Sequence, residues 1–143
     1  MDIRERIVAE ARKYIGVTFR HRGRSEKALD CVGLLYIVFQ KTVGVGNDFL
    51  DYPAQPTSAF CFFKIRDYGK RIVGEDAGPG DVILMHFAGV STHFGILTST
   101  GVIHANRYAG KVTEHSINSL EKAIGPGRIV AYFRMKGVPP WHQ

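Results

Sequence analysis

Cys31 is the residue whose position in this sequence best suits covalent chemistry. It follows Asp30, a residue type favoured at the N-cap of a helix, and precedes the apolar run 32–39. A thiol in the first turn of a helix lies beside backbone N–H groups that favour a thiolate and can stabilise an oxyanion. The alternative is a small core residue, the usual role of a cysteine in an apolar run. Cys61, within the aromatic run 60–63, is predicted to be such a core residue.

Two of the six histidines are placed to assist a thiol. His93 begins the β-rich segment 92–97 and His104 ends the segment 102–105, with a short hairpin at residues 99–101 between them. Pairing across such a hairpin brings two imidazoles to neighbouring positions on one face of a sheet. A thiol, a base and a group that orients the base form the arrangement required for nucleophilic catalysis. Histidines on adjacent strands also occur as structural residues or metal ligands, and the spacing alone does not separate these roles.

The segments before and after the cysteine are predicted to be helices. Residues 3–15 place apolar side chains on one helical face, with a start like a capping box at Asp2 and Glu5 and an end at Gly16. Polar and basic residues 20–29 predict an irregular loop. The apolar run after the cysteine is compatible with a buried strand or a buried helix, and the N-cap residue favours the helix.

The second half of the chain changes from helical to β-rich patterns. Residues 44–57 indicate a loop, and Thr57 or Ser58 is expected to cap a helix that extends to about Tyr68. Short β-rich segments then follow at regular spacing. The order predicts an α+β fold in which N-terminal helices pack on an antiparallel β-sheet. The predicted strands are Asp81–Phe87, His93–Thr98, Gly101–Ala105, Lys111–His115 and Arg128–Met135.

Length and composition place the chain among ordinary globular domains. Its 143 residues, 45% hydrophobic and 22% charged, predict a single domain over residues 1–143. No apolar run approaches the roughly 18–20 residues of a membrane span, and the N-terminal residues lack the apolar region of a Sec signal peptide. We therefore expect synthesis in the cytoplasm without a Sec signal. Two cysteines without a CxxC motif indicate neither a disulfide framework nor a zinc site.

The net charge of +6 favours anionic partners, among them nucleic acid, anionic lipid and cell-wall polymers. The Lys and Arg residues are scattered, however, and no run of five or more occurs. No RNP-like or helix-turn-helix-like pattern accompanies them. A basic nucleic-acid-binding domain is therefore the disfavoured alternative.

Four motifs, in order, resemble those of the NlpC/P60 cysteine peptidases: Asp-Cys-Val-Gly-Leu at 30–34, Pro-Gly-Asp-Val-Ile at 79–83, His-Phe-Gly-Ile-Leu at 93–97 and Ile-His-Ala at 103–105. The resemblance spans residues 3–135 and is greatest to the branch of phage and gene-transfer-agent cell-wall peptidases. It implies a papain-like α+β fold and cleavage of peptidoglycan stem peptides at the D-γ-glutamyl–diamino acid bond.

The resemblance also implies a role for each of three residues. Cys31 corresponds to the nucleophile, His93 to the general base and His104 to the residue that orients the base. We expect Cys31 and His93 to form a thiolate–imidazolium pair, because each charge favours the other. Neither a metal nor another cofactor is expected. The expected partners are the peptidoglycan peptide and phage tail proteins, with the protein carried in a virion to act on the cell wall.

The chain departs from the family pattern at two positions. Phe19 occupies the place, twelve residues before the cysteine, where the family commonly has a Tyr whose hydroxyl supports the oxyanion hole. Tyr36 or His21 is a candidate for the missing donor, and His21 is expected to line the cleft. Val32 replaces the serine of the family motif, whereas Asp30 remains to contact the amino terminus of the substrate. Phe19 and Val32 support an alternative function, a catalytically weak or silent structural or wall-binding module of a phage tail.

Overall fold

The helices and strands follow the predicted order, helices first and a mostly antiparallel sheet afterwards. The computed structural model describes residues 1–45, 48, 52–54, 56–86, 92–116, 119 and 129–141, so the predicted strand ends Phe87 and Arg128 lie outside the described residues. The elements are α1 (Ile3–Arg12), β1 (Thr18–Phe19), β2 (Arg24–Ser25), β3 (Ala28–Leu29), α2 (Cys31–Thr42), α3 (Ser58–Ile65), β4 (Gly69–Ile72), the 3-10 helix η1 (Gly74–Asp76), β5 (Val82–His86), β6 (Thr92–Leu97), β7 (Gly101–Asn106), β8 (Lys111–Ser116) and β9 (Ile129–Met135).

Helix α1 begins with the predicted capping box. The Asp2 carboxylate accepts a hydrogen bond from the Glu5 backbone N–H, and the Glu5 carboxylate accepts one from the Asp2 backbone N–H. The helix ends at Arg12, three residues earlier than predicted, and turns carry the chain to Gly16. Gly16 has a φ of 92° and donates its N–H to the Val112 carbonyl. This glycine therefore joins the chain to the sheet and does not cap the helix.

Helix α2 places Cys31 at its first position, and the helical interpretation of the apolar run is correct. The helix is apolar on several sides because α1 packs on one side and β6 and β7 pack on another. A Cβ atom on Gly33 would overlap the carbonyl oxygen of Gly23, so glycine is needed where loop 20–29 lies against the helix. This close approach positions the loop beside the start of α2.

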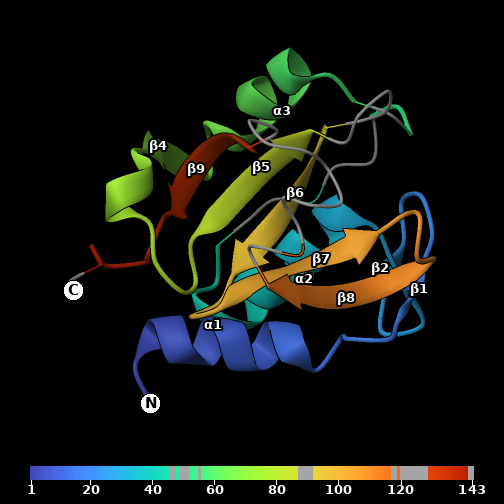
Figure 1. Cartoon of the computed structure of the whole chain (residues 1–143), viewed down its shortest axis with the longest axis horizontal. Coiled ribbons are helices and arrows are strands. Elements are labelled where there is room, and N and C mark those ends of the chain that lie inside the picture. Colours follow the sequence, from blue (N-terminus) through green and yellow to red (C-terminus); the bar gives the residue numbers. More distant parts are fainter. Residues whose placement is uncertain are drawn as a thin grey trace.

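The strands form one curled sheet in the order β2-β3-β1-β8-β7-β6-β5-β9-β4. Figure 1 shows β5 to β8 crossing the molecule with α2 behind them and α1 along one edge. Neighbouring strands are antiparallel except β1 and β3, which are parallel. The prediction of an irregular loop over residues 20–29 is wrong in part, because β2 and β3 lie within it. β4, which was not predicted, pairs with β9 through backbone contacts that its polar sequence does not indicate.

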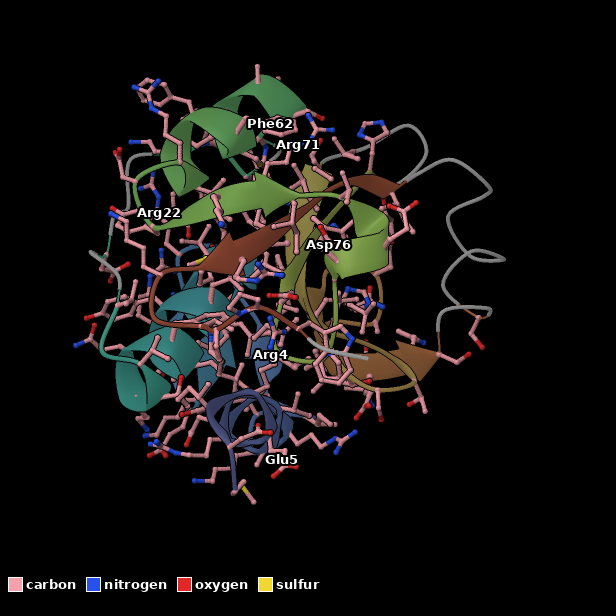
Figure 2. All side chains as sticks on the ribbon, turned by 90° about the vertical axis from the view of Figure 1, so that its left-hand side faces the viewer. Arg4, Glu5, Arg22, Phe62, Arg71 and Asp76 are labelled. Atoms are coloured by element: carbon pink, nitrogen blue, oxygen red, sulfur yellow. The ribbon has the colours of Figure 1, made fainter. Side chains whose placement is uncertain are left out.

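The main core lies between the helices and one face of the sheet, and a smaller cluster lies on the opposite face. A buried ion pair between Arg4 and Asp81, with Nη1 and Oδ2 2.9 Å apart, joins α1 to the start of β5. Figure 2 shows Arg4 directed toward the sheet and Glu5 on the outer side of the helix. The smaller cluster contains Ile83, Met85, Leu97 and Val102. No helix in the described part of the chain is long and apolar enough to cross a membrane.

Candidate active site

The Cys31 thiol is half-buried at the N-terminus of α2. Asp30 caps this helix, with its Oδ1 accepting a hydrogen bond from the Gly33 N–H at 2.8 Å. The backbone N–H groups of Phe94 and Val32 hydrogen-bond the sulfur and act to lower the thiol pKa. Because Phe94 directly follows His93 in β6, the sulfur lies next to the backbone of the proposed base.

Cys31 and His93 line the same cavity, which contains about 500 Å³ of space, part of it open to solvent. The other predicted site residues Asp30, Phe19 and His21 line it as well. The structure thus brings five of the six predicted residues to one cavity, with His104 behind His93.

His93 and His104 are in direct contact. The His93 Nε2 and His104 Nδ1 atoms are 3.1 Å apart, and the two rings stack with centroids separated by 5.2 Å. The adjacency predicted from the hairpin is therefore present. His104 is fully buried, and the His115 ring lies on its other side at a centroid distance of 5.3 Å. The contact between the two rings is observed, whereas the catalytic roles of His93 and His104 stay predictions.

Burial keeps both the thiol and the imidazoles uncharged. Burial, and to a lesser extent the Asp30 carboxylate, raises the pKa of Cys31 to about 12. Burial, followed by the neighbouring His104, holds the pKa of His93 well below its ordinary value. Burial also lowers the pKa of His104 to about 3, with a contribution from His115. Both pKa shifts oppose the ion pair predicted from the sequence and favour a neutral thiol beside a neutral imidazole.

Asp30 organises the wall of the cavity. It is 3% exposed, and its carboxylate accepts hydrogen bonds from the backbone of Gly33 and Arg22, from the Arg24 guanidinium at 2.9 Å and from the Tyr52 hydroxyl. Each of the two Asp30 carboxylate oxygens accepts two of these hydrogen bonds. Asp30 therefore joins the start of α2 to the preceding loop and to Tyr52, and its contact with a substrate amino terminus stays a prediction.

The structure separates the two candidates for the missing oxyanion donor. His21 lines the cavity, with its Nδ1 atom 3.9 Å from an Asp30 oxygen and its ring edge-on to Tyr52. Tyr36 instead lines a different, apolar cavity together with Phe39. The proposal of Tyr36 as a donor is therefore wrong, because the helical rotation from position 31 to position 36 directs it elsewhere.

Tyr52 and Arg107 were not predicted from the sequence. Both line the cavity, and both come from segments without regular structure. Burial and hydrogen bonding to Asp30 raise the pKa of Tyr52, which is 5% exposed. The buried Asp30 carboxylate needed several donors, which was an available signal for Tyr52, whereas no sequence signal pointed to Arg107.

A metal site is not evident around the cysteine. Within the described residues, no group of three His, Cys, Asp or Glu side chains is arranged to hold a metal ion. Cys61, predicted to be a core residue, is 3% exposed and packs in the main core, which confirms that prediction.

Comparison with known proteins identifies similar sequences and structures. The NlpC/P60 family model matches residues 16–124. The murein DD-endopeptidase/murein LD-carboxypeptidase MepS of Escherichia coli strain K12 is 23% identical over 113 residues, which cover 78% of this chain and 54% of that protein. The same protein from Escherichia coli O157:H7 matches equally. The chain thus spans about half the length of these curated relatives.

Solved structures of low sequence identity share the fold. The NlpC/P60 domain of the peptidoglycan hydrolase SagA has a TM-score of 0.66 and 23% identity, over 92% of this chain and 98% of that chain. NlpC2 from Trichomonas vaginalis has a TM-score of 0.69 and 19% identity, over 96% of this chain and 48% of that chain. The peptidoglycan hydrolase RipB from Mycobacterium tuberculosis has a TM-score of 0.64 and 18% identity, over 96% of this chain and 65% of that chain. These likenesses confirm the predicted papain-like α+β fold.

Proposed function

The chain belongs to the NlpC/P60 family, and on that premise we propose that it is a cysteine peptidase that hydrolyses peptidoglycan stem peptides at the D-γ-glutamyl–diamino acid bond. One observation carries this proposal: the Cys31 thiol and the His93 imidazole line one cavity at the start of α2, with His104 in contact with His93. The names of the similar proteins, murein endopeptidase and peptidoglycan hydrolase, support the substrate class.

In the proposed reaction, His93 takes the thiol proton while the Cys31 sulfur attacks the γ-carbonyl carbon of the glutamyl residue. The tetrahedral intermediate then expels the amine of the diamino acid, which receives the proton from His93. This leaves a γ-glutamyl thioester on Cys31. His93 next removes a proton from a water molecule that attacks the thioester, and the thiol recovers its proton as the acid product leaves.

His104 is proposed to fix the tautomer of His93. Because the pKa of His104 is lowered to about 3, this imidazole stays neutral and its Nδ1 atom can accept a hydrogen bond. His93 then donates its Nε2–H to His104 across the 3.1 Å contact. This leaves the Nδ1 lone pair of His93 to accept the thiol proton.

Oxyanion stabilisation is proposed to depend mainly on the backbone. The first N–H groups of a helix have no intrahelical acceptor, which places the Cys31 N–H at the developing negative charge. Phe19 adds no donor, because its ring has no hydroxyl. His21 is the candidate side chain for additional stabilisation.

Phe19 also favours the second candidate function, a catalytically weak or silent structural or wall-binding module of a phage tail. Defined γ-D-glutamyl–diamino acid muropeptides and mass analysis of the products separate the two functions. The peptidase produces two fragments whose masses identify the bond that is cut. A silent module leaves the muropeptides intact while the protein still sediments with purified cell walls.

The biological setting belongs to the same proposal. Within the family, we assign the chain to the phage and gene-transfer-agent branch, where carriage in a virion tail brings the protein to the wall. The sequence motifs around Asp30 and His93 support this assignment. Detection of the protein in purified particles by mass spectrometry tests it, and its presence only in the soluble fraction of producing cells would contradict it.

A further inference from the structure

The charges around the cavity are unevenly balanced. The Asp30 carboxylate is buried and is neutralised by the Arg24 guanidinium, which also pairs with Asp48 at 2.7 Å. Arg107 also lines the cavity, from the turn that follows β7. The cavity wall therefore includes a positive charge that Asp30 does not neutralise.

Arg107 is held by an aromatic ring and has no carboxylate partner among the described residues. Its guanidinium carbon lies 5.8 Å from the centre of the Phe19 ring, and no ion pair or side-chain hydrogen bond of Arg107 occurs in the described part of the chain. A guanidinium over a ring keeps its N–H donors available in its own plane. The half-buried Arg107 is thus prepared to bind a planar anion.

From this geometry we infer that Arg107 binds the free α-carboxylate of the glutamyl residue whose γ-carbonyl Cys31 attacks. The inference rests on the proposed function and names the feature of the substrate that the cavity recognises. In a γ-linked glutamyl residue, the α-carboxylate belongs to the same residue as the scissile carbonyl, so one cavity can contact both groups. Phe19, which lacks the hydroxyl common in the family, supplies the flat surface that orients the guanidinium.

Binding measurements test this inference without turnover. We compare a γ-D-glutamyl-lysine peptide with its α-carboxamide counterpart, using calorimetry and the Cys31→Ala protein. The carboxylate peptide should bind about tenfold or more tightly, the value expected for charge-assisted hydrogen bonds. Adding Arg107→Gln should abolish this preference, and Arg107→Lys should restore part of it. Arg6→Gln, which removes the same charge from the exposed face of α1, should leave the preference unchanged.

The outcomes separate the inference from the proposed function. A preference that survives Arg107→Gln overturns the inference, and so does the absence of binding by either peptide. Cleavage by the wild-type chain is measured in parallel. If the preference depends on Arg107 but neither peptide is cleaved, the binding inference holds and the peptidase proposal fails. If both peptides are cleaved with no effect of Arg107→Gln on the ratio of their kcat/KM values, only the inference fails.

Discussion

The Nε2 atom of His93 lies 3.1 Å from the Nδ1 atom of His104, and burial keeps both imidazoles neutral. One ring can therefore donate a hydrogen bond to the other without either being charged. This relationship selects the nitrogen of His93 that remains available to the Cys31 thiol. It makes His104 a positioning residue in the proposed mechanism.

Replacing His104 by Ala should lower kcat by about 10²-fold, because the His93 ring loses the contact that orients it. His104→Gln, which offers an amide oxygen as acceptor, should recover part of the loss. KM should change less than kcat, since His104 does not line the cavity. Peptide cleavage kinetics measure this effect, with circular dichroism to establish that both variants fold. Equal losses in both variants through KM alone would contradict the positioning role.

The pH dependence of cleavage should reflect a neutral thiol and a neutral imidazole. The pKa of His93 is well below its ordinary 6.5, and the pKa of Cys31 is raised from 9.0 to about 12. We therefore expect kcat/KM to stay level between pH 6.5 and 9.0, the ordinary values for these groups. Alkylation of the resting thiol by iodoacetamide should be slow at neutral pH. A bell-shaped profile with both limbs inside this range, together with rapid alkylation, would indicate the ion pair.

Acid should destabilise the fold through the buried histidines. The unfolded chain binds a proton at an ordinary imidazole pKa of 6.5, whereas folded His104 binds one only near pH 3. Between these values the unfolded state binds more protons, so the free energy of unfolding should fall as the pH falls, by at most about 1.4 kcal/mol per pH unit for this residue. Denaturant titrations at several pH values measure the slope. His104→Gln should reduce it, and an unchanged slope would contradict this assignment.

Asp30→Ala should lower the free energy of unfolding by about 3 kcal/mol, because it removes a buried partner of Arg24 and the cap of α2. Asp30→Asn should cost less, since an Asn side chain still caps the helix. Asp48→Ala is the matched control, because it removes the more exposed partner of Arg24 and should cost less than about 1 kcal/mol. Denaturant unfolding measures all three variants, and equal effects of Asp30→Ala and Asp48→Ala would exclude the organising role of Asp30.

Phe19→Tyr tests whether the oxyanion hole lacks a donor. If position 19 lies beside the developing charge, the new hydroxyl should raise kcat by up to about 10²-fold with a smaller effect on KM. If Phe19 acts only as a packing residue, the variant should gain no rate and should lose about 1–3 kcal/mol of stability through an unpaired buried donor. Measuring kcat and Tm on the same preparation separates the two results.

Local sequence signals predicted the structure correctly where they directly determine the backbone geometry. The N-cap at Asp30 decided between helix and strand for the run that follows, and the hairpin between His93 and His104 brought the two rings together. Tyr52 and Arg107 were missed because segments distant in the sequence bring them to the cavity, and no local periodicity marks them. Such positions depend on tertiary packing.

The charge states of the Cys31 thiol and the His93 imidazole could not be predicted from the sequence either, because they also depend on tertiary packing. A helix N-terminus and a neighbouring histidine both favour a thiolate, and both features are visible in the sequence. Burial opposes them, and its extent around Cys31 depends on how β6 and the loop residues cover the thiol. Burial is the largest contribution to the pKa shifts of Cys31 and His93, and both shifts oppose the predicted ion pair.

The identity of the nucleophile is tested most directly by mass analysis of muropeptides after incubation with wild-type, Cys31→Ala and Cys61→Ala proteins. The chain has two cysteines, so Cys61→Ala is a matched control that removes the thiol of the core. We predict cleavage between D-γ-glutamate and the diamino acid by the wild-type and Cys61→Ala proteins, with no cleavage by Cys31→Ala. Cleavage by Cys31→Ala at the wild-type rate would contradict the assignment of Cys31 as the nucleophile.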